Sequence, residues 1–99
     1  MEKMLATMTT KPNYESEIIK IVKGNGSPKV ILNQLENYHG SDIADVIEQL
    51  NEQERKKIFR ICPAEMLAEA FSHLEETQAG AYLNEIPLKK VTEILAELE

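Results

Sequence analysis

The sequence predicts an all-α protein, built as a right-handed α-solenoid (a superhelix) of short antiparallel helix pairs. First, an apolar stripe with the i, i+3, i+4, i+7 spacing of an amphipathic helix occurs three times. Second, the three stripes follow one another at a fixed step of ~24 residues, which indicates an internal repeat. Third, only short turns can separate the helices, and short turns favour antiparallel neighbours that bury their stripes together. The stripes are Ile43, Val46, Ile47 and Leu50; Leu67, Ala70, Phe71 and Leu74; and Val91, Ile94, Leu95 and Leu98.

The composition fits a single small domain with an aliphatic core. Of the 99 residues, 42% are hydrophobic and 5% aromatic, and tryptophan is absent. No apolar run approaches the roughly 18 residues that a transmembrane helix needs, and the first residues lack the apolar core of a signal peptide. We therefore expect a soluble chain that does not insert into a membrane. The formal net charge of −6 argues against a nucleic-acid partner, because an acidic surface repels phosphate.

The N-terminal third is expected to contain a lead and two short helices. Residues 1–12 show no periodicity, so we expect them to be disordered. Asn13 can cap a helix that carries four branched apolar residues and ends at Gly24, because glycine accepts the left-handed geometry of a helix C-terminus. Ser27 and Pro28 suit the cap and the first turn of the next helix.

The later helices also have recognisable starts. His39 or Ser41 can cap the helix of the first stripe, and Asp42 then lies in its first turn, where an acid interacts favourably with the helix dipole. Asn51 and Glu54 have the spacing of a capping box. HGSDIADV, residues 39–46, is therefore interpreted as a helix start and not as a metal site.

The second and third stripes are each preceded by a proline. Pro63 and Pro87 are separated by the same step as the stripes, and we expect both at the first position of their helices. The third stripe reaches Leu98 with no following repeat to pack on. We therefore expect a helical-repeat domain of residues 13–99 that is truncated at its C-terminal end.

Residues 35–98 resemble the N-terminal cytoplasmic, superhelical domain of MgtE-type magnesium transporters. The resemblance is carried by LENYHGSDIADVIEQLNEQERKKIFRICPAEMLAEAFSHLEE and continues to Leu98. The family pattern is a leucine-rich helix, then His-Pro-x-Asp-hydrophobic-Ala, an acidic turn, a Leu-Pro step and an AEVL-x-x-L helix. This chain departs from the pattern at Gly40, where the family has proline, and at Cys62, where it has leucine.

The resemblance implies a regulatory domain and not an enzyme. In that family the domain lies on the cytoplasmic side of the membrane and precedes a pair of CBS domains and a transmembrane pore, and the full-length protein is expected to be a homodimer. Mg²⁺ held between acidic faces of the cytoplasmic parts keeps the pore closed. The implied cofactor is therefore Mg²⁺, bound weakly and shared with a partner domain.

Glu69 matches the interface glutamate of the family's AEVL helix, which makes it the first candidate metal ligand. Asp45 and Glu93 share its register, one repeat before and one repeat after it, so stacked helices would carry a row of carboxylates. Such a row would attract Mg²⁺, which takes oxygen ligands and keeps much of its water. The alternative from the residues alone is a solvated flank, which is usual on amphipathic helices.

Two further residues are interpreted as structural. His39 has no cysteine or second histidine three or four residues away, and His73 is far along the chain, so a zinc site is not expected. Cys62, the only cysteine, excludes an internal disulfide and is expected to be buried or capping. No phosphate loop or nucleophile elbow is present.

The alternative function is a protein-interaction scaffold of helical repeats, such as a flagellar motor switch-like module.

Overall fold

The computed structural model describes residues 13–98, which contain seven α-helices and no strand. The all-α prediction is therefore confirmed, whereas the lead predicted at residues 1–12 lies outside the described residues. The helices are α2 (Tyr14–Lys23), α3 (Pro28–Leu35), α4 (Gly40–Ile47), α5 (Glu52–Ile61), α6 (Ala64–Phe71), α7 (Glu76–Leu83) and α8 (Leu88–Leu98).

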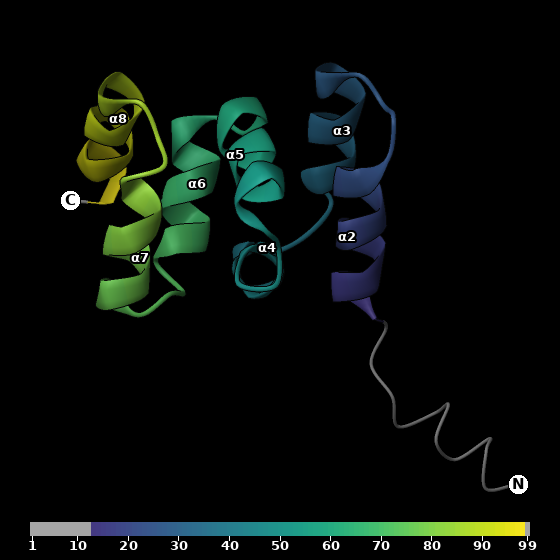
Figure 1. The fold of residues 1–99 in the computed structure, drawn as a ribbon, viewed down its shortest axis with the longest axis horizontal. Helices are drawn as coiled ribbons and strands as arrows, with labels where there is room; N and C mark the ends of the chain where they lie inside the picture. The colour runs from purple at the N-terminus through teal and green to yellow at the C-terminus, as the bar shows by residue number, and fades with distance from the viewer. Residues whose placement is uncertain (1–12, 99) are drawn as a thin grey trace, which may run out of the picture.

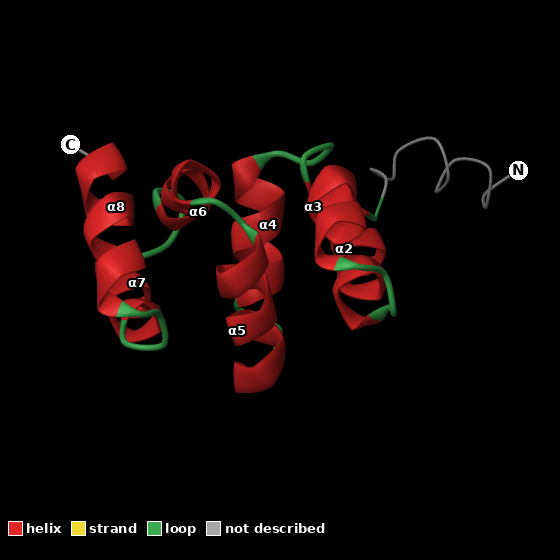
Figure 2. Ribbon diagram, turned by 90° about the horizontal axis from the view of Figure 1, so that it is seen from above, coloured by secondary structure: helices red, strands yellow, loops and turns green. Residues whose placement is uncertain are grey.

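The helices form a row, from α2 and α3 at one end to α7 and α8 at the other (Figure 1). The even-numbered helices contact one another in order: α2 packs on α4, α4 on α6 and α6 on α8. Figure 1 shows α4 nearly end-on and α6 from the side, and Figure 2 shows the reverse, so these two helices cross steeply. This crossing decides which residues of α6 meet the start of α4.

The core is apolar and continuous along the row. Phe59 of α5 packs edge-on against Phe71 of α6, with ring centroids 5.8 Å apart. No polar or charged residue is buried in the part of the chain that the structure describes. The buried side chains are Ile18, Val22, Ile31, Leu35, Ile43, Ala44, Val46, Ile47, Leu50, Ile58, Phe59, Cys62, Leu67, Ala68, Ala70, Phe71, Ile86 and Ile94. The first two predicted stripes thus supply much of the core.

The predicted caps at the first two helices are confirmed by hydrogen bonds. Asn13 Oδ1 accepts from the backbone N–H of Ser16 at 3.0 Å, at the start of α2. Ser27 Oγ accepts from the backbone N–H of Val30 at 3.3 Å, at the start of α3. Both side chains supply a partner to an N–H that the first turn of a helix leaves free.

Two local predictions, on the end of α2 and on the prolines before α6 and α8, are wrong. Gly24 ends α2 in an extended conformation (φ −75°, ψ −179°) and not in the left-handed one. Pro63 and Pro87 each precede a helix and are not its first residue, because α6 begins at Ala64 and α8 at Leu88. In the third stripe, Ile94 is fully buried in α8, which packs on the preceding helix α6, whereas Leu95 and Leu98 remain 47% and 44% exposed.

Two lysines from other helices reach the C-terminal ends of α2 and α5. Lys57 Nζ donates to the carbonyl oxygens of Val22 (2.7 Å) and Gly24 (3.2 Å). Lys90 Nζ donates in the same way to the carbonyl oxygen of Phe59 at 2.6 Å. A cation suits the negative end of a helix and supplies a donor to carbonyls without an intrahelical partner. The Lys57 contact also explains why α2 can end without a left-handed glycine.

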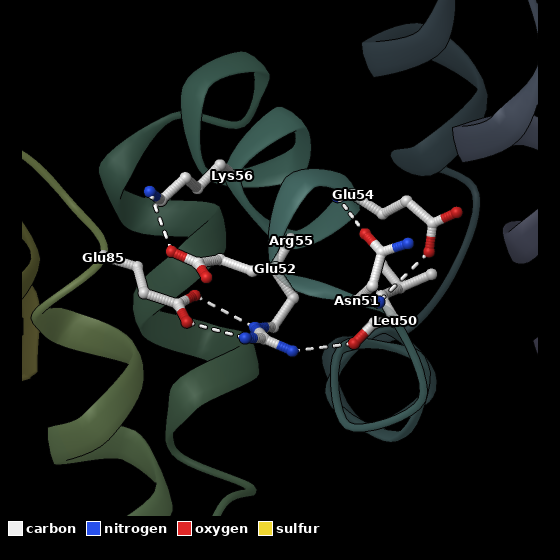
Figure 3. A network of polar contacts seen from close by, with 7 residues as sticks. All are labelled: Leu50, Asn51, Glu52, Glu54, Arg55, Lys56 and Glu85. Carbon is white, nitrogen blue, oxygen red and sulfur yellow. Dashed lines mark hydrogen bonds and ion pairs between the residues drawn. The ribbon is translucent and has the colours of Figure 1, made fainter.

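A polar network joins α5 to the turns on either side of it (Figure 3). The predicted capping box is confirmed: Asn51 Oδ1 accepts from the N–H of Glu54 at 2.9 Å, and Glu54 Oε1 accepts from the N–H of Asn51 at 3.1 Å. Arg55 donates through Nε and Nη2 to the Glu85 carboxylate at 2.9 and 2.6 Å. Its Nη1 also donates to the carbonyl oxygen of Leu50 at 2.7 Å. These contacts tie the α4–α5 turn to the α7–α8 turn.

Candidate functional site

Glu69 is the sixth residue of α6 and projects from a helix whose other faces are packed. Its neighbours Ala68 and Ala70 are buried, whereas Glu69 itself is exposed. Its side chain lies over the first residue of α4, because a Cβ added to Gly40 would clash with Glu69 Cγ. The glycine at position 40 therefore permits the close approach of this carboxylate to the start of α4.

Two open pockets flank this part of α6, and Glu65 and Glu69 line both. Glu36, just after α3, adds a third carboxylate to the pocket of about 250 Å³ on one side. Glu97 of α8 adds one to the pocket of about 310 Å³ on the other side. Carboxylate oxygens that surround open space offer hard donors to a cation that keeps part of its hydration shell. We call these four residues (Glu36, Glu65, Glu69 and Glu97) the acidic surface.

Asp45 and Glu93 have the predicted register but different surroundings. They are the sixth residues of α4 and α8, as Glu69 is of α6, and both are exposed. Neither is among the residues that line the two acidic pockets. The structure therefore surrounds Glu69 with acids that the repeat register did not indicate. The sequence does hold a signal for Glu65 and Glu97. Glu65 lies four residues before Glu69, Glu97 lies four residues after Glu93, and residues four apart lie on one helix face.

His39 is the N-cap of α4, as predicted. Its Nδ1 accepts from the backbone N–H of Ser41 at 3.1 Å, and Asp42 lies in the first turn. His73 is far along the chain but lies beside His39 in the fold, with the two imidazole centroids 5.5 Å apart. His73 Nε2 also lies 3.4 Å from Glu69 Oε2. The steep crossing of α4 and α6 brings the end of one helix to the start of the other.

Cys62 is buried, as predicted, at the C-terminal end of α5. Its side chain has no exposed surface, and its backbone N–H donates to the carbonyl oxygen of Ile58 at 2.9 Å. Burial raises the pKa of the Cys62 thiol to about 12. A thiol that stays protonated at neutral pH is neither a nucleophile nor a metal ligand.

Comparison with known protein families assigns the chain to one family. None of the helices between residues 13 and 98 is both long and apolar enough to span a bilayer. No curated protein and no solved structure is a match to the chain. A family model described as the MgtE intracellular N domain matches residues 38–99, well over half of the sequence, including α4 to α8 and Glu69. The chain therefore belongs to the MgtE intracellular N domain family, the N-terminal domain of MgtE-type magnesium transporters.

Proposed function

We propose that this domain regulates a magnesium transporter by contributing carboxylates to a Mg²⁺-sensing site on the cytoplasmic side of the membrane. The observation that supports the proposal is the gathering of acids around Glu69, of which Glu65, Glu69 and Glu97 lie within the residues that match the family. The proposed role is binding and gating, without catalysis.

The proposed site is weak and needs a partner. Glu69 and the acids beside it on α6 and after α3 are exposed, so water competes for their oxygens and their side chains lose entropy on binding. Mg²⁺ demands octahedral oxygen coordination and gives up water reluctantly, so one or two carboxylates hold it through a partly intact hydration shell. Additional acids from CBS domains of the same transporter would complete the site and couple it to the pore. A homodimer would carry two copies.

The repeat architecture supports the same assignment. Helices α4, α6 and α8 begin at Gly40, Ala64 and Leu88, which are equally spaced along the chain. Helices α3, α5 and α7 begin at Pro28, Glu52 and Glu76, with the same spacing. We propose that these pairs form a right-handed superhelix, on which α6 holds Glu69 between α4 and α8. A domain built in this way offers a continuous surface to its partner.

Mg²⁺ titration of the chain, followed through backbone amide NMR shifts, tests the site. Progressive shifts are expected around Glu65 and Glu69 at millimolar Mg²⁺, the range of weak and partly hydrated sites. Glu69→Gln preserves the size of the side chain but removes its charge, so it should remove most of the response. Glu76→Gln is the matched control, because Glu76 is an exposed helical acid outside both pockets.

The same titration separates the acidic surface from the carboxylate row. If the row of Asp45, Glu69 and Glu93 binds the ion, Asp45→Asn and Glu93→Gln should weaken the response as much as Glu69→Gln does, and Glu65→Gln should not. If the acidic surface binds it, Glu65→Gln and Glu69→Gln should weaken the response, whereas Asp45→Asn and Glu93→Gln should not. Spectra that Mg²⁺ leaves unchanged, or shifts that persist in Glu69→Gln, would contradict the proposed Mg²⁺ role.

A second candidate is a protein-interaction scaffold without a metal role, as in a flagellar motor switch-like module. The observation in its favour is the exposed apolar surface of α8, where Leu88 is 80% and Leu95 47% exposed. Exposed apolar patches often mark contact surfaces. A chain that ignores Mg²⁺ but loses a protein contact on Leu95→Ser would support this alternative.

A further inference from the structure

We propose that His39, Glu69 and His73 form a surface site for a transition-metal dication, with Zn²⁺ as the best-fitting ion. One donor atom from each side chain lies within 4.8 Å of the other two. The three residues lie on or next to two crossing helices, and none is needed for the apolar core. This inference goes beyond the proposed Mg²⁺ role, because two imidazole nitrogens define a different class of ion.

The spacing of the Glu69–His73 donor pair matches the coordination shell of zinc. His73 Nε2 and Glu69 Oε2 are 3.4 Å apart. Zinc binds imidazole nitrogen and carboxylate oxygen at roughly 2.0–2.2 Å, so two ligands at the tetrahedral angle lie about 3.4 Å from each other. Glu69 and His73 are also four residues apart on one helical face, which keeps the pair together as the third ligand approaches.

His39 can supply the third ligand through its other ring nitrogen. Its Nδ1 lies 3.1 Å from the backbone nitrogen and 3.0 Å from the hydroxyl oxygen of Ser41, so Nε2 is the nitrogen free to bind an ion. When Nδ1 accepts from the Ser41 N–H, the neutral ring carries its proton on Nε2. A metal at Nε2 moves that proton to Nδ1, which then donates to Ser41 Oγ and no longer accepts from the Ser41 N–H. Metal-binding histidines usually have such an acceptor behind them, and it fixes the tautomer.

The donor set selects the ion. Two imidazoles and one carboxylate suit zinc and its neighbours, whereas Mg²⁺ prefers oxygen throughout. Three protein ligands on an exposed surface leave the fourth zinc position to water or to a donor from another molecule. The buried thiol of Cys62 does not compete for the ion, because its pKa is about 12.

Titration of the chain with ZnCl₂ tests the site, with side-chain NMR of the two imidazoles as the readout. Zinc should convert His39 from the Nε2–H to the Nδ1–H tautomer and shift His73 at the same metal concentration. Ser41→Ala removes the acceptor behind His39 and should weaken binding about tenfold, the lower end of second-shell effects. Co²⁺ gives an optical check, because a tetrahedral site produces visible absorption bands.

Two variants remove a ligand with little risk to the fold. His39→Asn exchanges one N-capping side chain for another, and His73→Asn alters an exposed position after α6. Each should weaken zinc binding by more than Ser41→Ala does, whereas the control Glu93→Gln should leave it unchanged. Zinc binding that survives both histidine variants, or that leaves the His39 tautomer unchanged, would overturn the proposal.

The zinc and magnesium proposals can fail separately. His39→Asn and His73→Asn should abolish the zinc response but leave the Mg²⁺-induced shifts intact, because Mg²⁺ uses carboxylate oxygen and water. Glu69→Gln should weaken both. A chain that responds to ZnCl₂ but not to Mg²⁺ would keep the histidine site and reject the Mg²⁺ role. A chain that responds to Mg²⁺ but not to ZnCl₂ would reject the histidine site and keep the Mg²⁺ role.

Discussion

Replacing Arg55 with methionine tests whether the polar network around α5 holds the α4–α5 turn to the α7–α8 turn. The guanidinium makes three hydrogen bonds: two to the Glu85 carboxylate and one to the carbonyl oxygen of Leu50. It also lies 5.0 Å from the centre of the Tyr82 ring. Its hydrogen bonds to Glu85 raise the pKa of Arg55, so the charged form is favoured in the fold. Methionine keeps the apolar stem but loses all these polar contacts.

The structure sets the size of the expected effect. Both side chains of the Arg55–Glu85 pair are 17% exposed, so the pair is neither fully exposed to solvent nor fully buried. Hydrogen bonds to charged groups contribute about 1.5–3 kcal/mol and a cation–π contact about 0.5–1 kcal/mol, but partial solvent screening reduces the sum. We expect Arg55→Met to lower the free energy of unfolding by about 2–3 kcal/mol. For a domain of this size that lowers the melting temperature by roughly 10–20 °C.

Urea unfolding followed by far-ultraviolet circular dichroism measures this loss, because the protein is helical and lacks tryptophan. A double-mutant cycle with Glu85→Gln isolates the pair, and we expect a coupling of about 1–2 kcal/mol. Lys56→Met is the matched control on the same helix. Lys56 pairs with Glu52 at 2.9 Å, but the two side chains are 50% and 60% exposed, so water screens the pair and its loss should cost far less than the loss of Arg55.

A stabilising role for the network is refuted if Arg55→Met costs no more than Lys56→Met, or if the cycle shows no coupling between Arg55 and Glu85. Either result would mean that the contacts in Figure 3 exchange with water at no cost. A changed urea dependence would instead point to an altered unfolded state, so the comparison requires equal slopes among the variants.

Three further predictions concern helix ends and the buried thiol. Asn51→Ala removes the capping box with Glu54 and should lower the free energy of unfolding by about 1 kcal/mol in the same urea assay. An unchanged free energy of unfolding would mean that water replaces the cap. Lys90→Met leaves the Phe59 carbonyl without its donor and should cost about 1–2 kcal/mol, and an equal stability would show that the contact is dispensable. Cys62 has a pKa raised by burial from its ordinary 9.0 to about 12, so folding favours its protonated form. The stabilisation that this pKa shift gives the fold is fully present below about pH 9. It is lost as the pH rises towards 12, at up to ~1.4 kcal/mol per pH unit. Urea midpoints of the wild type should therefore fall faster above pH 9 than those of Cys62→Ala, and parallel curves would contradict the shift.

Much of the fold could be predicted because its signals are local. Asn13, Ser27 and Asn51 cap their helices through bonds that span three residues. The apolar stripes predict the core because helical periodicity repeats within four residues. The error at Gly24 has a tertiary cause: a lysine from α5 satisfies the carbonyls that a left-handed glycine turn would otherwise have served.

The sequence by itself determined the helices, their order, the stripes that form the core, the family resemblance and the choice of Glu69. Only the tertiary structure decided what surrounds Glu69. The angle at which α4 and α6 cross depends on how the side chains along both helices interlock, and the periodicity of one chain does not specify it. That crossing places Glu69 over Gly40 and brings His39 to His73, which is far along the chain from it. Residues so distant in sequence meet only after the helices have packed, which is why the histidine pair could not be predicted from spacing.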